Sequence, residues 1–153
     1  MSQKTVLLAE DDASIRLIVN QTLVTAGYTV RATSSPEALE RWVRNGEGDI
    51  VVTDVYLTDT PIFELLPSFK LVRPELPIIV MSGQNTILTA ASAAQHGAYD
   101  YLPKPFDLPD LMKRTARALE LRQHSRRAPA VSDERPEKVS EASSGFIRFR
   151  DAQ

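Results

Sequence analysis

The chain contains no cysteine among its 153 residues, which excludes disulfide bonds, thiolate metal sites and cysteine nucleophiles. Its only two histidines, His96 and His124, cannot form a histidine-rich metal site by themselves. Eighteen basic against twenty acidic residues give a net charge of -2, so binding to nucleic acid through bulk charge is not supported. No secretory signal is recognisable, and no apolar run approaches the roughly 18–20 residues of a membrane span. These absences predict a cytoplasmic protein that does not bind membranes.

Five short apolar runs alternate with stretches of helical spacing. The runs cover residues 5–9, 28–32, 49–53, 76–81 and 98–102. Three of them are apolar throughout and rich in β-branched residues, as is typical of strands that are covered on both faces of a parallel sheet. Five strands alternating with five helices predict an α/β fold with helices on both faces of that sheet.

The stretches between the runs carry helix signals. Ser35-Pro36 predicts an N-cap followed by a first-turn proline, and Thr60-Pro61 predicts a second start of the same kind. Pro67 lies inside the third helical pattern, where it is expected to kink or shorten the helix. The apolar face of the first helix is predicted to consist of Ile15, Ile18, Val19, Thr22 and Ala26.

The helical and strand patterns stop after about residue 123. Residues 125–153 mix Ser, Pro, Ala and charges of both signs, with no apolar period before residue 146. A segment this polar buries too little surface to offset its ordering entropy. The sequence therefore predicts one domain over residues 1–122 and a disordered tail or linker over residues 123–153.

Polar side chains follow four of the five predicted strands. In chain order they are Glu10, Asp11, Asp12, Asp54, Ser82 and Lys104. Because the carboxyl ends of parallel strands meet at one edge of a sheet, these side chains are expected to converge. Clustered carboxylates repel one another, and a hard divalent cation such as Mg²⁺ suits their oxygen atoms.

Within such a cluster, Asp54 has the chemistry of a carboxylate nucleophile that forms an acyl phosphate. The metal ion and Lys104 would neutralise the incoming phosphoryl oxygens. Taken alone, an Asp after a strand is usually a helix cap and a Lys-Pro pair is usually a turn. Their occurrence together, at the ends of four different strands, favours a phosphoryl-transfer site.

These motifs together resemble the receiver domain of two-component response regulators over roughly residues 4–122. Residues 81–86 and 97–108 resemble, more narrowly, the receivers of NtrC-type nitrogen regulators. The resemblance implies a flavodoxin-like, doubly wound (βα)5 fold with strand order 2-1-3-4-5. It also implies Asp54 as the phosphorylation site, Asp11 as a Mg²⁺ ligand and Asp12 as its water-mediated partner. The backbone carbonyl of Tyr56 would complete the metal shell.

The resemblance assigns roles to four further residues. Ser82 would follow the phosphoryl group, and Tyr101 would be the switch aromatic. Lys104 would pair with the phosphate, and the Lys104–Pro105 peptide bond would be cis. A sensor histidine kinase would be the donor. The fourth helix, fifth strand and fifth helix would control an output domain or protein partner in transcriptional regulation, with a homodimer through the same surface as one form. The chain would not be an enzyme beyond its own phosphorylation and dephosphorylation.

The segment after Asp54 departs from the family pattern. Many receivers carry Met-Pro shortly after the acceptor, whereas residues 55–62 here lack it and include the additional negative charge of Asp59. An alternative is therefore a receiver that is not phosphorylated and acts only as a protein-interaction module. An aspartate phosphohydrolase is disfavoured, because such enzymes typically have a second Asp two residues after the nucleophile, where this chain has Tyr56. No Walker motif of an NtrC-like ATPase domain is present.

Overall fold

A computed structural model describes residues 3–83 and 87–127 of the chain. Residues Met1–Arg122 form one compact unit. The tail was predicted over residues 123–153, but residues 123–127 are helical and belong to a helix that ends at Arg127. The rest of the predicted tail lies outside the described residues. No helix in the described ranges has both the length and the apolar character needed to cross a bilayer.

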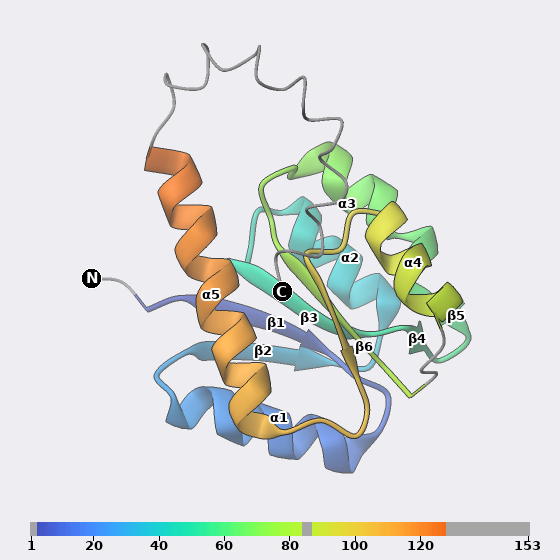
Figure 1. The fold of residues 1–153 in the computed structure, drawn as a ribbon, viewed down its shortest axis with the longest axis horizontal. Coiled ribbons are helices and arrows are strands. Elements are labelled where there is room, and N and C mark those ends of the chain that lie inside the picture. Colours follow the sequence, from blue (N-terminus) through green and yellow to red (C-terminus); the bar gives the residue numbers. More distant parts are fainter. Residues whose placement is uncertain (1–2, 84–86, 128–153) are drawn as a thin grey trace. The chain divides into compact units, whose positions relative to one another are not determined.

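The core of the unit is a five-stranded parallel sheet, shown in Figure 1. In chain order its strands are β1 (Thr5–Ala9), β2 (Thr29–Thr33), β3 (Ile50–Asp54), β6 (Ile78–Ser82) and β7 (Asp100–Pro103). Their spatial order is β2-β1-β3-β6-β7, and every neighbouring pair is parallel. Counting only these five strands, the order is 2-1-3-4-5, so the predicted fold is confirmed.

Helices cover both faces of the sheet. They are α1 (Ala13–Thr25), α2 (Pro36–Arg44), α3 (Leu66–Val72), α4 (Ile87–Gln95) and α5 (Leu108–Arg127). Helices α2 and α3 pack on one face around a core that includes Leu39 and Phe69, and α1 and α5 pack on the other around Leu23 and Leu111. Each fully buried side chain of this kind contributes about 1.5–3 kcal/mol, so the two apolar layers hold the strand ends in place.

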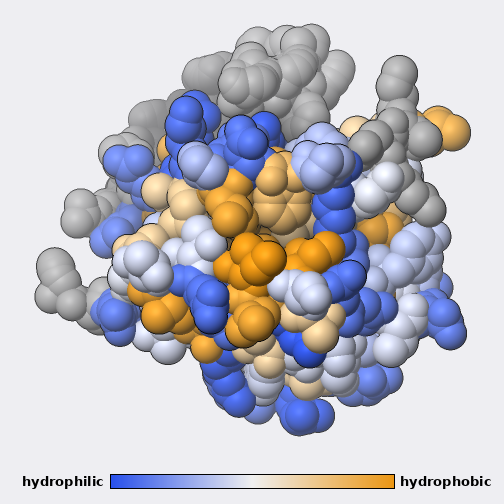
Figure 2. Space-filling model, turned by 90° about the horizontal axis from the view of Figure 1, so that it is seen from below, coloured by the Kyte–Doolittle hydropathy of each residue, from blue (hydrophilic) through white to orange (hydrophobic). Residues whose placement is uncertain are grey.

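The buried face of α1 differs from the prediction. Val19 and Leu23 are the residues it buries, whereas Ile18 is 49% exposed and Ala26 is exposed. Figure 2, which views the molecule from the side of α1, shows apolar atoms gathered at the centre of that face. Leu17, Ile18 and Val24 of α1 are among the exposed large apolar residues of the molecule. Ile15 and Val19 pack in the core as predicted, but the packing buries Leu23 in place of Ile18 and Ala26.

The predicted helix start at Thr60-Pro61 is wrong. Residues Tyr56–Leu57 form β4 and Thr60–Pro61 form β5, a short antiparallel hairpin that is followed by a 3-10 turn at Ile62–Glu64. Leu57 and Ile62 are both fully buried, and this burial on either side of the turn favours the hairpin over a helix. Helix α3 begins only at Leu66 with Pro67 in its first turn, so Pro67 shortens the helix as expected.

Candidate functional site

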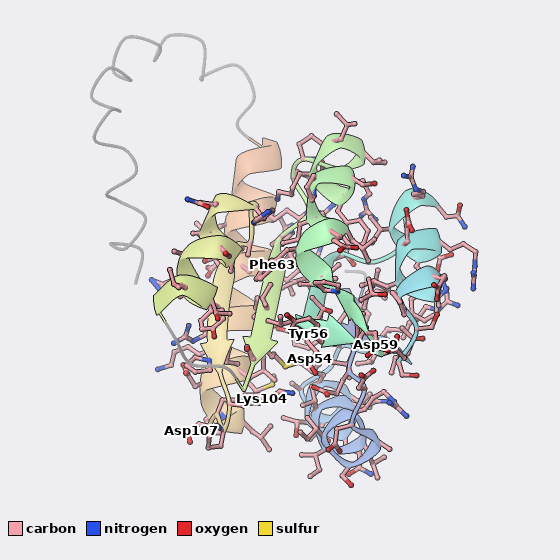
Figure 3. The ribbon with its side chains drawn as sticks, turned by 90° about the vertical axis from the view of Figure 1, so that its right-hand side faces the viewer. Asp54, Tyr56, Asp59, Phe63, Lys104 and Asp107 are labelled. Atoms are coloured by element: carbon pink, nitrogen blue, oxygen red, sulfur yellow. The ribbon has the colours of Figure 1, made fainter. Side chains whose placement is uncertain are left out.

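A buried cluster of two carboxylates and one ammonium group lies at the carboxyl edge of the sheet. Lys104 Nζ is 2.9 Å from Glu10 Oε1 and 3.3 Å from Asp54 Oδ2. The Glu10 side chain is only 1% exposed, and those of Asp54 and Lys104 are 16% and 18% exposed. Figure 3 shows Asp54 and Lys104 together at this end of the sheet, with Asp107 farther away. The predicted meeting of Asp54 and Lys104 is therefore observed.

The strand register produces this meeting. Asp54, the last residue of β3, pairs with Met81 of β6, and Ser82 of β6 pairs with Pro103 of β7. The strands therefore end side by side, and Lys104 follows β7 directly. Its backbone N–H donates to the carbonyl of Ser82 at 2.7 Å, which holds the start of the loop against β6. The N–H of Val55 donates to Asp54 Oδ1 at 3.0 Å and orients the carboxylate.

Burial and charge shift the ionisation of the cluster. Desolvation, together with the neighbouring carboxylate of Glu10, raises the pKa of Asp54 to about 6, although Lys104 acts in the opposite direction. Burial lowers the pKa of Lys104, but its hydrogen bonds and charge interactions with Glu10 and Asp54 outweigh this effect and raise it. With both acids ionised the cluster carries one excess negative charge in a poorly solvated place, which favours the approach of a cation.

Asp11 lies at the rim of the site and contacts the hairpin rather than Lys104. Both of its carboxylate oxygens accept from the backbone N–H of Thr58, at 3.0 Å and 2.7 Å. Its side chain is exposed. Because the amide contacts both oxygens, a further ligand of Asp11 would share at least one of them with the N–H of Thr58.

The structure does not bring Asp12 into the cluster. Its side chain is the N-cap of α1, where Oδ1 accepts from the N–H groups of Ser14 and Ile15 at 2.9 Å and 3.1 Å. The acid that faces Lys104 is Glu10, for which the sequence predicts no separate role. The available signal was the position of Asp12 three residues before the apolar Ile15, which is typical of an N-cap.

The N-cap role of Asp12 predicts a difference between two substitutions. Asp12→Ala is expected to lower the free energy of unfolding by about 1 kcal/mol, because two helix N–H groups lose their acceptor. Asp12→Asn keeps a capping oxygen and is expected to change stability by only a few tenths of a kcal/mol. Urea unfolding of both variants tests this. Equal losses for the two would show that the charge of Asp12, rather than its cap, is what matters.

The oxygen atoms at this edge fit Mg²⁺, which commonly uses one or two carboxylates and keeps several waters. The resemblance implies that Asp11 and Asp54 would supply the carboxylates. The register pairs Tyr56 with Pro61, which has no N–H, so the Tyr56 carbonyl receives no ladder bond from that partner. In residues 3–83 and 87–127 there is no group of three or more acidic or histidine side chains placed to hold a metal. The donor set that the resemblance implies is therefore limited to two carboxylates and a carbonyl.

The remaining predicted residues lie around this edge. Ser82 is buried at the end of β6, and Tyr101 on β7 is partly buried against the core beneath α2 and α3. The Lys104–Pro105 peptide bond is cis, the isomer that the resemblance implies. Ser82 therefore lies on β6, the strand next to β3, and Tyr101 lies on β7, one strand farther away.

The chain matches the response regulator receiver domain over residues 6–116. With the sheet order and the Asp54–Lys104 pair, this match shows that the chain belongs to the receiver family. A CheY-like receiver domain protein from Methanospirillum hungatei JF-1 has the same fold, with a TM-score of 0.77, 24% identity and coverage of 81% of this chain and 99% of that one.

Within this family the sequence is of the NtrC type. It is 55% identical over 119 residues to the DNA-binding transcriptional regulator NtrC of Rhizobium meliloti (strain 1021), which covers 78% of this chain and 25% of that protein. The beryllofluoride-activated NtrC4 receiver domain dimer is 26% identical with a TM-score of 0.74, over 78% of this chain and 99% of that one. The chain spans about a quarter of the length of the curated NtrC relatives that it matches.

Proposed function

We propose that the chain is a phosphoacceptor switch that receives a phosphoryl group from a sensor histidine kinase on Asp54. The observation that carries this proposal is the partly buried Asp54 carboxylate, which ends β3 within 3.3 Å of the Lys104 ammonium in a receiver fold. A nucleophile needs its ionised form, and a phosphoryl group needs a cation beside it. This edge of the sheet provides both.

The transfer itself is a displacement at phosphorus. An oxygen of the Asp54 carboxylate forms a bond to phosphorus while the bond from phosphorus to the imidazole nitrogen of phosphohistidine breaks. The electron pair stays on that nitrogen, which takes up a proton. Lys104, held between Glu10 and Asp54, lies where negative charge accumulates on the phosphoryl oxygens. The product is an acyl phosphate on Asp54.

Asp11, Asp54 and the Tyr56 carbonyl are the groups that would hold Mg²⁺ in this site. When bound, the ion supplies positive charge that neutralises the phosphoryl oxygens. Asp12 is not part of this set, because its oxygen caps α1.

Phosphorylation then changes the balance of contacts around Lys104. The phosphoryl group adds about one to two negative charges and three strong acceptor oxygens, which compete with Glu10 for Lys104 and attract the hydroxyl of Ser82. Movement of Ser82 toward the phosphoryl group would in turn let Tyr101 move inward. This is a shift between two packings of the surface formed by α4, β7 and α5.

The relatives support an output in transcription. The matching NtrC proteins are DNA-binding transcriptional regulators, and the NtrC4 receiver is a dimer. We propose that the α4, β7 and α5 surface of this chain controls an output domain or partner in transcription, including through a homodimer.

The exposed Leu17 and Ile18 of α1, close in sequence to Asp11, offer apolar surface to the kinase. On this proposal the protein is cytoplasmic and does not turn over an external substrate.

The proposal predicts a defined covalent product. Incubation with acetyl phosphate and Mg²⁺ is expected to add one phosphoryl group to the chain, as measured by the mass of the intact protein. Asp54→Asn is expected to remove this labelling, because an amide is not a competent nucleophile. Asp12→Asn is the matched control and is expected to be labelled like the parent. Full labelling of Asp54→Asn would refute the acceptor assignment, and an unlabelled parent chain would favour an interaction-only receiver.

A further inference from the structure

The hairpin that follows the acceptor holds the carboxylate of Asp11. The N–H of Thr58, at the turn between β4 and β5, donates to both oxygens of Asp11 across 47 positions of the chain. The hydroxyl of Thr58 is engaged locally, where it donates to the carbonyl of Leu57. The bond to Asp11 therefore comes from the backbone amide alone.

Thr58 adopts an unusual conformation to make this bond. Its φ is 54°, and among the described residues it is the one non-glycine residue with a positive φ. This left-handed backbone conformation is energetically unfavourable for threonine, whose side chain is β-branched. Glycine adopts it without this penalty. The backbone of Thr58 is therefore strained while its N–H contacts Asp11, and it would return to a negative φ if this contact were broken.

Buried residues of the hairpin and of the turn after it hold the Thr58 amide in position. Leu57 on β4 and Ile62 directly after β5 are fully buried, and the N–H of Ile62 donates to the carbonyl of Val55 at 2.6 Å. Figure 3 shows Tyr56 and Asp59 of the hairpin beside Asp54. The turn is thus anchored in the core under α3 while its tip reaches the rim of the site.

We propose that the Thr58 amide is a latch that competes with Mg²⁺ for the carboxylate of Asp11, so that the β4–β5 hairpin sets the cation affinity of this receiver. This proposal rests on the proposed function, in which Asp11 is a metal ligand. A cation at Asp11 needs at least one of the two oxygens that the latch occupies. Binding therefore weakens the contact with Thr58 and lets the turn relax, which couples cation occupancy to the position of the hairpin.

Two substitutions at the same position have opposite expected effects. Thr58→Gly keeps the N–H and adopts φ of 54° without strain, so the state in which this N–H contacts Asp11 is stabilised. Mg²⁺ should therefore bind about two- to fivefold more weakly. Thr58→Pro removes the N–H and is confined to φ near -65°, so the latch is lost and Mg²⁺ should bind at least about threefold more tightly.

The measurement is the dissociation constant of Mg²⁺, obtained by calorimetric titration of the full chain without a phosphodonor. In ¹⁵N-labelled protein, the amide resonance of Thr58 is expected to shift during the titration with the same midpoint. Circular dichroism and thermal unfolding establish that Thr58→Pro is folded. If that variant does not fold, Thr58→Gly together with the Thr58 amide resonance decides the outcome.

The outcomes separate the latch from the proposed function. Thr58→Gly binding Mg²⁺ as tightly as the parent chain, or more tightly, would overturn the latch and leave the phosphoacceptor assignment intact. A Thr58 amide that does not respond to saturating Mg²⁺ would overturn it as well. If neither the parent chain nor either variant bound Mg²⁺, the magnesium assignment would fail and the latch with it, while acetyl phosphate labelling would still report on Asp54.

Discussion

Asp54→Asn is expected to stabilise the fold by about 2 kcal/mol at pH 8, at the same time as it abolishes phosphoryl uptake. The pKa of Asp54 is raised from 3.8 to about 6 in the folded chain, chiefly by burial and then by Glu10. One pKa unit corresponds to about 1.4 kcal/mol, so ionising Asp54 in the fold costs up to about 3 kcal/mol. The expected gain is set below this limit because the site is partly solvated and coupled to Glu10.

The sign of the pH dependence follows from the raised pKa. The folded state binds the proton of Asp54 more tightly than the unfolded state, so the stability contributed by this group is fully present below about pH 3.8. It is lost as the pH rises through about 6. Asparagine is always neutral. The free energy of unfolding of Asp54→Asn should therefore equal that of the parent chain at low pH, where Asp54 is protonated, and exceed it above pH 6, where Asp54 is ionised.

Urea unfolding of the parent chain and of Asp54→Asn at pH 8 and pH 4 measures this difference. Asp12→Asn makes the same chemical change at a helix cap and is expected to give no comparable gain at pH 8. A gain of equal size at both pH values, or a loss at pH 8, would show that Asp54 is not destabilised by its own charge. The expected result would place the nucleophile among functional groups that are maintained at a cost in stability.

Lys104→Met is expected to lower the free energy of unfolding by about 3 kcal/mol at pH 8. The substitution leaves Glu10, which is 1% exposed, without the ammonium group 2.9 Å away, and an uncompensated buried charge is costly. The pKa of Asp54 should rise above its value of about 6, because Lys104 is the group that lowers it. Loss of the cation should also slow labelling by acetyl phosphate.

A second substitution tests whether the unpaired charge of Glu10 causes the loss of stability. In Glu10→Gln/Lys104→Met the buried negative charge is removed as well, so most of the lost stability should return. Lys113→Met makes the same exchange at an exposed position of α5 and should change stability by less than about 0.5 kcal/mol. If the double variant were as unstable as Lys104→Met, packing of the lysine stem would be the cause instead of the ion pair.

Features carried by short stretches of chain could be predicted from the sequence. Three of the five strands come from runs that are apolar and rich in β-branched residues, and the Ser35 cap of α2 with its following proline lies where predicted. Asp54 and Lys104 were identified because residues that follow parallel strands must gather at one edge of the sheet. The strand and cap signals span the same few residues as the elements they predict, whereas Asp54 and Lys104 are brought together by a general property of parallel sheets.

Other features depended on residues distant in the sequence. Thr60-Pro61 has the local pattern of a helix start, yet burial of Leu57 and Ile62 in the core makes it the second strand of a hairpin. Ile18 and Leu23 have similar hydrophobicity, and packing against the sheet decided that Leu23 is the buried one.

The sequence by itself determined the alternation of strands and helices, the edge at which the acids gather and the aspartate that is proposed as the nucleophile. Only the tertiary structure decided that Glu10, rather than Asp12, faces Lys104, and that Thr58 binds Asp11. Local preference sets the backbone of a few residues, whereas the direction of a polar side chain depends on which partner the whole fold brings within about 3 Å.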